Sequence, residues 1–132
     1  MNDILLGTDI CQISRVKSAT DKYGDKFLNK IFTNNEINYA KQSNLSIYER
    51  LAVRFATKEA VSKALGVGIN KMGWNKGINW KDVEVIRQDF GKLSIELYGK
   101  AKIIATEANI SKWKVSVSHM GDYATSTVIA IK

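Results

Sequence analysis

The segment from Arg54 to Gly68, RFATKEAVSKALGVG, constrains the fold of this chain more than any other stretch. Its apolar residues are spread around much of a helical circumference, which predicts a helix packed against other parts of the protein on several sides. The capping sequence at 46–49 is expected to open this helix, and Gly66 is expected to end it after Leu65 as a left-handed C-cap. A helix of this kind needs a sheet and further helices around it.

The rest of the chain divides into helical and strand-like segments. Strands are predicted at 4–10, 83–86, 93–97, 115–119 and 124–131. Further helices are predicted after Ser14, as its cap, to about Lys22, after a capping box at 33–36, and over 98–109. A Gly/Asn-rich loop that contains Trp74 is expected at 69–80. Helices grouped early and hairpins grouped late predict an α+β fold, with helices packed on a largely antiparallel sheet. Without prolines or low-complexity stretches, residues 1–132 are expected to form a single domain.

The composition is that of a soluble globular protein with an anionic partner. Apolar residues make up 45% of the 132 positions and charged residues 25%. There are 20 Lys plus Arg against 13 Asp plus Glu, a formal charge of +7. The single cysteine, Cys11, excludes an internal disulfide framework and favours a reducing compartment. The N-terminus has neither a basic region nor an apolar span, so we expect a cytoplasmic protein, or one in an organelle matrix, and no membrane association.

Four charged residues on the apolar central helix, Arg54, Lys58, Glu59 and Lys63, are the first candidates for chemistry. A Glu59–Lys63 pair on a solvated face would be worth only about 0.3–0.5 kcal/mol. In apolar surroundings, however, ionic groups are costly unless they are paired or liganded. A carboxylate that holds Mg²⁺, beside cations that neutralise phosphate, would explain all four. Asp9, at the end of the first predicted strand, is a candidate second carboxylate.

Three motifs in the chain carry a resemblance to a known family. They are Gly7-Thr8-Asp9, then Phe55-Ala56-Thr57-Lys58-Glu59-Ala60 followed by Lys63-Ala64, and finally Ser116-Val117-Ser118-His119. In order and spacing they resemble holo-[acyl-carrier-protein] synthase, the short bacterial type of 4′-phosphopantetheinyl transferase. The resemblance extends over nearly the whole chain.

The resemblance implies an activity and an assembly. An enzyme of this family transfers the 4′-phosphopantetheine moiety of coenzyme A to a serine of an apo acyl carrier protein and releases adenosine 3′,5′-bisphosphate. It requires Mg²⁺ and serves fatty acid biosynthesis by default. The implied structure is the 4′-phosphopantetheinyl transferase fold, assembled as a homotrimer with active sites between neighbouring subunits.

The resemblance also assigns roles to individual residues. The catalytic residues are Asp9, Glu59 and Lys63, of which Asp9 and Glu59 are the magnesium ligands. The residues assigned to coenzyme A are Arg54, Lys63, Gly66 and His119. Arg15 matches a basic position that meets the carrier protein. Lys22 and Lys26 would share a helix face with Arg15 if the first helix continued past Gly24.

Two alternatives compete with the transferase. A basic nucleic-acid-binding α+β module without catalysis would account for the charge, but it predicts aromatic and basic residues interleaved on a strand, and the predicted strands carry no such pattern. A transferase-like protein that binds coenzyme A without turnover is disfavoured by the presence of Asp9, Glu59 and Lys63. We therefore expect coenzyme A and an acyl carrier protein as partners, and no nucleic acid.

Overall fold

The fold is that of a computed structural model, which describes residues 3–70 and 77–132; Trp74 and half of the expected loop around it lie outside the described residues. The strands are β1 (Ile4–Gln12), β2 (Val83–Arg87), β3 (Leu93–Leu97), β4 (Lys112–Met120) and β5 (Tyr123–Ile131). The α-helices are α1 (Ile13–Tyr23), α2 (Asp25–Ile31), α3 (Asn34–Lys41), α4 (Ile47–Leu65) and α5 (Gly99–Glu107). The predicted α+β class is confirmed.

The strands form two antiparallel sheets. The larger has the order β1–β5–β4, so that β1 and β4 are its opposite edges, and β2 pairs with β3 in a separate hairpin. In the larger sheet Asp9 of β1 lies opposite Ser126 of β5, while His119 of β4 lies opposite Ala124. Two predicted site residues are therefore carried by opposite edges of the same sheet.

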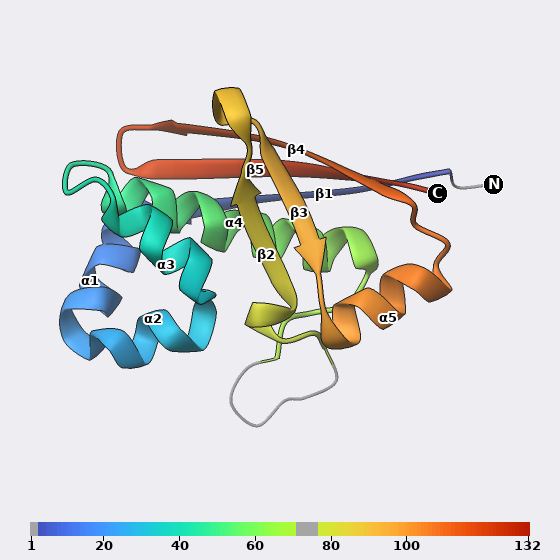
Figure 1. The fold of residues 1–132 in the computed structure, drawn as a ribbon, viewed down its shortest axis with the longest axis horizontal. Helices are drawn as coiled ribbons and strands as arrows, with labels where there is room; N and C mark the ends of the chain where they lie inside the picture. Colours follow the sequence, from blue (N-terminus) through green and yellow to red (C-terminus); the bar gives the residue numbers. More distant parts are fainter. Residues whose placement is uncertain (1–2, 71–76) are drawn as a thin grey trace.

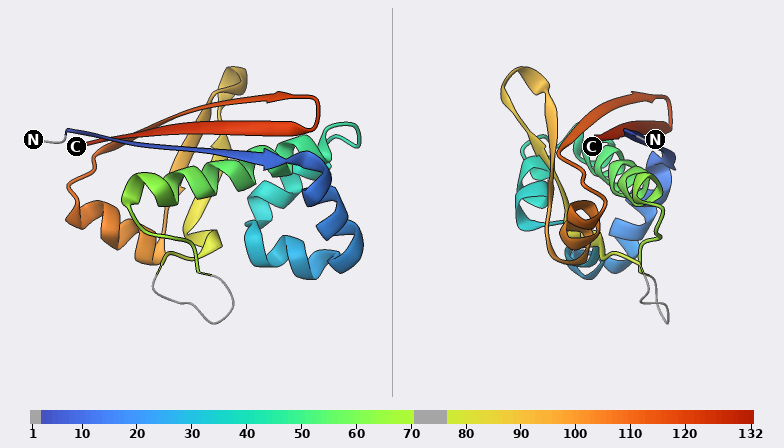
Figure 2. Two further views of the ribbon diagram at one scale, coloured as in Figure 1. Left: turned by 180° about the vertical axis from the view of Figure 1, so that it is seen from behind. Right: turned by 90° about the vertical axis from the view of Figure 1, so that its right-hand side faces the viewer.

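Helix α4 runs along one face of the larger sheet and is the centre of the core (Figures 1 and 2). Its closest approach to the sheet is at Gly7 of β1. A Cβ atom at this glycine would lie 1.9 Å from the carbonyl oxygen of Ala60 and 2.9 Å from the backbone nitrogen of Ala64. Only a residue without a side chain allows β1 and α4 to pack this closely.

The other face of the larger sheet is not covered by any element that the structure describes (Figure 2). Every second residue of β1 points to this side, and Ile4, Leu6 and Ile10 are 60%, 64% and 60% exposed. Aliphatic side chains this exposed on a regular strand are typical of a surface for association. None of the described helices has the length and apolar character needed to cross a bilayer.

The predicted helix ends are partly confirmed. The capping box at Thr33 and Glu36 is present, and Gly66 ends α4 with a φ of 74°. Ser46 precedes α4 but its side chain makes no capping hydrogen bond, so that prediction is wrong. Ser14 does not cap α1 either: the helix begins at Ile13, and the Ser14 backbone N–H and hydroxyl both donate to Asp122.

Candidate active site

The first half of the candidate site joins β1 to the C-terminal turns of α4. The Nζ atom of Lys63 lies 2.9 Å from Oδ1 of Asp9 and also donates to the carbonyl oxygen of Thr8 at 3.0 Å. Asp9 is half-buried and Lys63 is exposed. These two residues are 54 positions apart in the chain, and the close packing of α4 on Gly7 brings them together.

Glu59 belongs to the same half of the site because it lies one helical turn before Lys63 on α4. Cys11 is buried in β1 two residues after Asp9, and its thiol is influenced by the carboxylates of both Asp9 and Glu59. Its burial, together with the negative charges of Asp9 and Glu59, raises the pKa of Cys11 to about 11. At neutral pH the thiol is therefore protonated, as expected for a packing residue and not for a nucleophile.

The chemistry of this donor set fits a magnesium ion. Mg²⁺ binds through one or two carboxylates and completes its coordination with water and phosphate oxygens. Asp9 and Glu59 supply two carboxylates from two rigid elements, and Lys63 supplies a cation beside them. Within the part of the chain that the structure describes there is no group of three or more His, Cys, Asp or Glu side chains, so a site made wholly of protein ligands is not indicated there.

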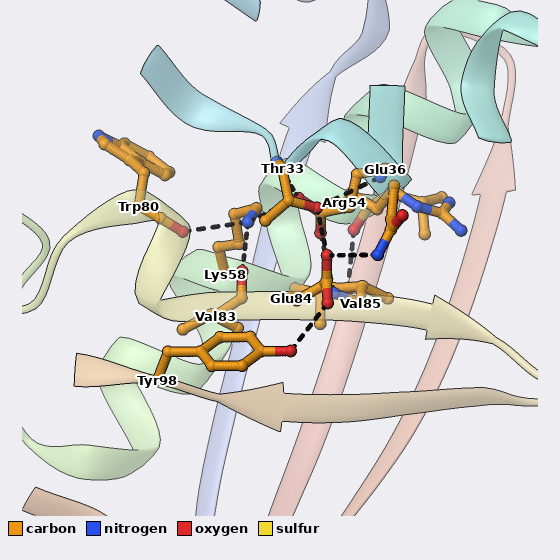
Figure 3. A network of polar contacts seen from close by, with 12 residues as sticks. Thr33, Glu36, Arg54, Lys58, Trp80, Val83, Glu84, Val85 and Tyr98 are labelled. Carbon is orange, nitrogen blue, oxygen red and sulfur yellow. Dashed lines mark hydrogen bonds and ion pairs between the residues drawn. The ribbon is translucent and has the colours of Figure 1, made fainter. Parts of the chain in front are cut away.

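Lys58 does not belong to this cleft, which corrects the expectation drawn from the sequence. Its side chain is fully buried and lies 2.9 Å from Oε1 of Glu36, which is also fully buried. Its Nζ atom donates to the backbone carbonyls of Trp80 and Val83, as Figure 3 shows. Burial lowers the pKa of Lys58, and the Glu36 carboxylate opposes that change. Lys58 thus connects α4 to α3 and β2 by polar contacts, and it does not lie where it could bind a phosphate beside Lys63.

Glu36 completes this buried network from α3. One carboxylate oxygen accepts from the backbone N–H of Thr33 and the other from that of Val85, at 2.9 and 2.8 Å. The carboxylate of Glu84 accepts from the hydroxyls of Thr33 and Tyr98 (Figure 3). Because these contacts satisfy the buried charges from several directions, the network fixes how α3, α4 and β2 are oriented.

Arg54 and His119 form a second half of the site on the other side of α4. They line a pocket of about 310 Å³ between α4, the β2–β3 hairpin and the edge strand β4. Arg54 and Lys63 are nine positions apart, which at roughly 100° per residue places them on opposite sides of the helix. Within one chain, the two groups of predicted site residues therefore lie at opposite edges of the sheet.

Arg54 is 3% exposed and its Nε atom has no hydrogen-bond partner. Its guanidinium donates to the carbonyl of Arg50 at 3.2 Å and lies 4.5 Å from the centre of the Tyr39 ring. Burial is the main cause that lowers the pKa of Arg54; the charge of Glu36 opposes this change, and the nearby charges of Arg50 and Arg87 add to it. A buried cation with an unused donor is suited to bind an anion.

The remaining predicted residues are at the surface. Gly66 is exposed, and its left-handed backbone conformation is explained by its role as the C-cap of α4. Arg15, Lys22 and Lys26 are all exposed, but the premise of one continuous helix is wrong. Gly24 has a φ of 58° and separates α1 from α2, so Lys26 is on a different helix from the other two.

Sequence reasoning missed Tyr39, Arg50 and Arg87, which surround Arg54 in its pocket. Arg50 could have been found, because it lies four positions before Arg54, and two like charges at this spacing on a helix are unfavourable unless an anion compensates them. Tyr39 and Arg87 come from distant segments and carry no local signal.

Comparisons with known proteins agree on one family. Residues 5–128 match the family model described as 4′-phosphopantetheinyl transferase superfamily. The chain is 40% identical over 129 residues to the holo-[acyl-carrier-protein] synthase of Caldanaerobacter subterraneus, covering 98% of this chain and 95% of that protein.

Solved structures of two such synthases have the same fold. The enzyme from Neisseria meningitidis superposes with a TM-score of 0.82 at 30% identity, covering 97% of this chain and 98% of the other. The Helicobacter pylori enzyme in complex with coenzyme A superposes with a TM-score of 0.79 at 28% identity, covering 96% and 99% of the two chains. The chain therefore belongs to the holo-[acyl-carrier-protein] synthase family of 4′-phosphopantetheinyl transferases.

Proposed function

We propose that the protein transfers the 4′-phosphopantetheine moiety of coenzyme A to a serine of an apo acyl carrier protein, with Mg²⁺ as cofactor. The other product is adenosine 3′,5′-bisphosphate, and the modified carrier serves fatty acid biosynthesis in the cytoplasm. Besides the family assignment, one observation carries this proposal. Asp9 and Lys63, far apart in the chain, meet at 2.9 Å with Glu59 one helical turn away.

The residues of this cluster can each take a defined part in phosphoryl transfer. The serine oxygen forms a bond to the phosphorus that carries the pantetheine arm, and the bond from this phosphorus to the leaving phosphate oxygen breaks. Glu59 accepts the serine proton through a water molecule, because a hydroxyl is a poor nucleophile without a positioned base. Lys63 stabilises the negative charge on the departing phosphate of adenosine 3′,5′-bisphosphate.

Asp9 and Glu59 are the residues that would hold Mg²⁺. When bound, the ion neutralises charge on the diphosphate and orients it for in-line attack. The ion pair with Lys63 holds the Asp9 carboxylate against the C-terminal turns of α4. The cluster is therefore arranged to supply both the negative ligands for a metal and a cation for the leaving group.

The active site is split between neighbouring subunits of a homotrimer. Asp9, Glu59 and Lys63 lie at the β1 edge of the sheet, and Arg54 and His119 lie at the β4 edge. A single ligand reaches both groups where the β1 side of one subunit faces the β4 side of the next. The uncovered aliphatic face of the sheet offers a surface for that contact.

The carrier protein docks on the basic surface of α1 and α2. Arg15, Lys22 and Lys26 are exposed there, and Arg15 also lines a hollow of about 380 Å³ beside Cys11 on β1. Cationic side chains at the mouth of the site steer an acidic carrier protein towards the carboxylate cluster.

The proposal is tested by incubating an apo acyl carrier protein with coenzyme A and Mg²⁺ and measuring its mass. We expect one phosphopantetheine to be added, and no addition when the metal is chelated. Glu59→Gln should lower the rate by roughly 10²–10⁴-fold, because it removes a metal ligand and a proton acceptor together. Asp9→Asn should remove the other metal ligand. Glu107→Gln, an exposed carboxylate on α5, is the control and should keep the full rate.

An unchanged rate in Glu59→Gln, or transfer that persists without divalent metal, would contradict these roles. No mass gain on any of several carrier proteins would contradict the transferase itself. A nucleic-acid-binding module remains the competing candidate, and retention on an RNA column with no carrier modification would favour it.

A further inference from the structure

Asp122, in the turn between β4 and β5, holds the start of α1 from outside the helix. Its carboxylate accepts hydrogen bonds from the backbone N–H of Ser14 at 2.8 Å and from the Ser14 hydroxyl at 2.6 Å. Its backbone carbonyl accepts from the N–H of Ile13 at 2.7 Å. The turn reaches α1 because β5 begins at Tyr123, directly opposite Gln12, the last residue of β1 (Figure 1). A contact between residues 108 positions apart thus fixes where β1 passes into α1.

Helix α1 needs this outside contact because its own first turn is poorly stabilised. Within the residues that the structure describes, its N-cap, Gln12, makes no side-chain capping bond, and its first turn contains no acidic residue. The third residue of the helix is Arg15, and a cation is unfavourable there because the first N–H groups carry partial positive charge. The Asp122 carboxylate supplies both the missing acceptor and a negative charge. The hydrogen bonds from Ser14 lower the pKa of Asp122, so this charge is present at neutral pH.

The residue that follows Ser14 is Arg15, which the proposed function assigns to carrier-protein binding. Arg15 lines the hollow of about 380 Å³ together with Cys11. Because Cys11 lies two residues after Asp9 on β1, this hollow adjoins a proposed metal ligand. The direction of a side chain on a helix is set by the backbone of its own turn. Asp122, which holds the first turn of α1, therefore also determines where Arg15 points relative to the hollow.

We propose that Asp122 is a positioning residue for carrier-protein binding, which holds the first turn of α1 so that Arg15 meets an acidic side chain of the carrier protein. The inference rests on the proposed function. Asp122 is itself acidic, so its charge repels an acidic carrier protein. Electrostatic repulsion alone therefore predicts that removing this charge strengthens carrier binding, whereas the positioning role predicts that it weakens carrier binding. The two explanations differ in the sign of the effect.

The variants Asp122→Ala and Asp122→Asn test this sign in the carrier-modification assay, with the KM for the carrier protein and the KM for coenzyme A measured separately. Asp122→Ala should raise the carrier KM about fivefold, the effect of losing one exposed ion pair, and leave kcat and the KM for coenzyme A near their wild-type values. Asp122→Asn keeps an oxygen acceptor for the Ser14 N–H and should cause a smaller rise. A carrier KM that is unchanged or lower in Asp122→Ala would overturn the proposal while leaving the transferase assignment intact.

A double-variant cycle shows whether Asp122 acts through Arg15. Arg15→Ala alone should also raise the carrier KM about fivefold. Adding Asp122→Ala to Arg15→Ala should cause no further rise, because the side chain that Asp122 positions is then absent. Increases that multiply independently would contradict action through Arg15. The control, Asp21→Asn, removes an exposed carboxylate near the other end of α1 and should not raise the carrier KM.

Two measurements without turnover keep this inference separate from the transferase assignment. Hydrogen–deuterium exchange of α1 is compared in the wild type, Asp122→Ala and Asp21→Asn. The amides of the first turn should exchange faster only in Asp122→Ala, and unchanged exchange would overturn the role of Asp122 at the helix start. If the wild type modified no carrier protein, calorimetric binding of the apo carrier would still decide the inference. Binding about fivefold weaker in Asp122→Ala would support it, and equal or tighter binding would overturn it.

Discussion

At the scale of single residues, Lys58 and Glu59 show how one position along a helix changes the role of a charge. The two side chains are adjacent in the motif but point in directions that differ by roughly 100°. Lys58 enters the core and pairs with Glu36, whereas Glu59 lies on the side of α4 that carries Lys63. The same motif therefore supplies one residue to the scaffold and one to the proposed active site.

Replacing Lys58 should destabilise the protein strongly. Lys58→Met leaves Glu36 buried without its counter-ion and two backbone carbonyls without their donor. We expect the free energy of unfolding to fall by about 3–5 kcal/mol, which urea denaturation followed by circular dichroism would measure. The double variant Lys58→Met/Glu36→Gln should lose less than the sum of the two single variants, because neither charge remains unpaired. Strictly additive losses would show that the pair is not coupled.

At the scale of elements, the contact between β1 and α4 decides whether the first half of the site exists. Asp9 is on the strand, Glu59 and Lys63 are on the helix, and Gly7 sets the distance between the two elements. The structure makes the strand glycine a steric requirement of the site as well as of the core.

Gly7→Ala should therefore impair stability and activity together. The new methyl group would meet the carbonyl oxygen of Ala60 at 1.9 Å, so β1 must move away from α4. We expect the free energy of unfolding to fall by about 1–3 kcal/mol. We also expect a lower kcat, because Asp9 would move away from Lys63. Urea denaturation and the carrier-modification assay measure the two effects.

Gly121→Ala is the matched control. This glycine lies in the β4–β5 turn with a φ of 59°, and no atom lies within 4 Å of the added methyl group. It should cost about 1 kcal/mol through backbone strain and leave kcat unchanged. If Gly7→Ala behaved like Gly121→Ala, the close approach of strand and helix would not matter for the site.

At the scale of the whole molecule, the proposed site residues fall into two groups at opposite edges of the larger sheet. Asp9, Glu59 and Lys63 lie along one edge strand, and Arg54 and His119 lie near the other. The proposed homotrimer would join unlike halves from adjacent subunits. This makes activity a property of the assembly.

Mixing two inactive variants tests this directly. Glu59→Gln impairs one half of the site and His119→Ala the other, so each pure variant should have little activity. When the two are unfolded together and refolded as mixed trimers, about a quarter of the sites should combine two intact halves. The recovered rate of carrier modification should approach that fraction of the wild-type rate.

The control mixes Glu59→Gln with Asp9→Asn, which impair the same half and should recover nothing. Absence of recovery in the first mixture, in samples shown by light scattering to be mixed oligomers, would place the complete site within one subunit.

The α+β class, the capping box at Thr33, the C-cap at Gly66 and the long central helix could all be predicted from the sequence. Each depends on contacts within a few residues, and such contacts leave a local pattern. Two predicted helix caps failed. Ser46 has the right type and position but makes no capping bond, whereas Ser14 lies inside the first turn of α1 and is bonded to Asp122 across the fold.

The candidate site divides in the same way. Asp9, Glu59 and Lys63 could be named from their motifs, because the chemistry of metal and phosphate restricts which residue types can serve. That Lys58 is paired with Glu36, and that Tyr39 and Arg87 lie in the same pocket as Arg54, had no counterpart in the sequence. The partners of these residues come from segments whose packing is not encoded in local spacing.

The sequence by itself determined the types of element, where several of them end, and the family motif with its candidate site residues. Only the tertiary structure decided which direction each charge on α4 faces and that the two half-sites lie at opposite edges of one sheet. The physical reason is that helical periodicity sets the angles between side chains on α4, but not which neighbours receive them. That depends on where β1, β4 and the β2–β3 hairpin pack around the helix, and those contacts join residues far apart in the chain.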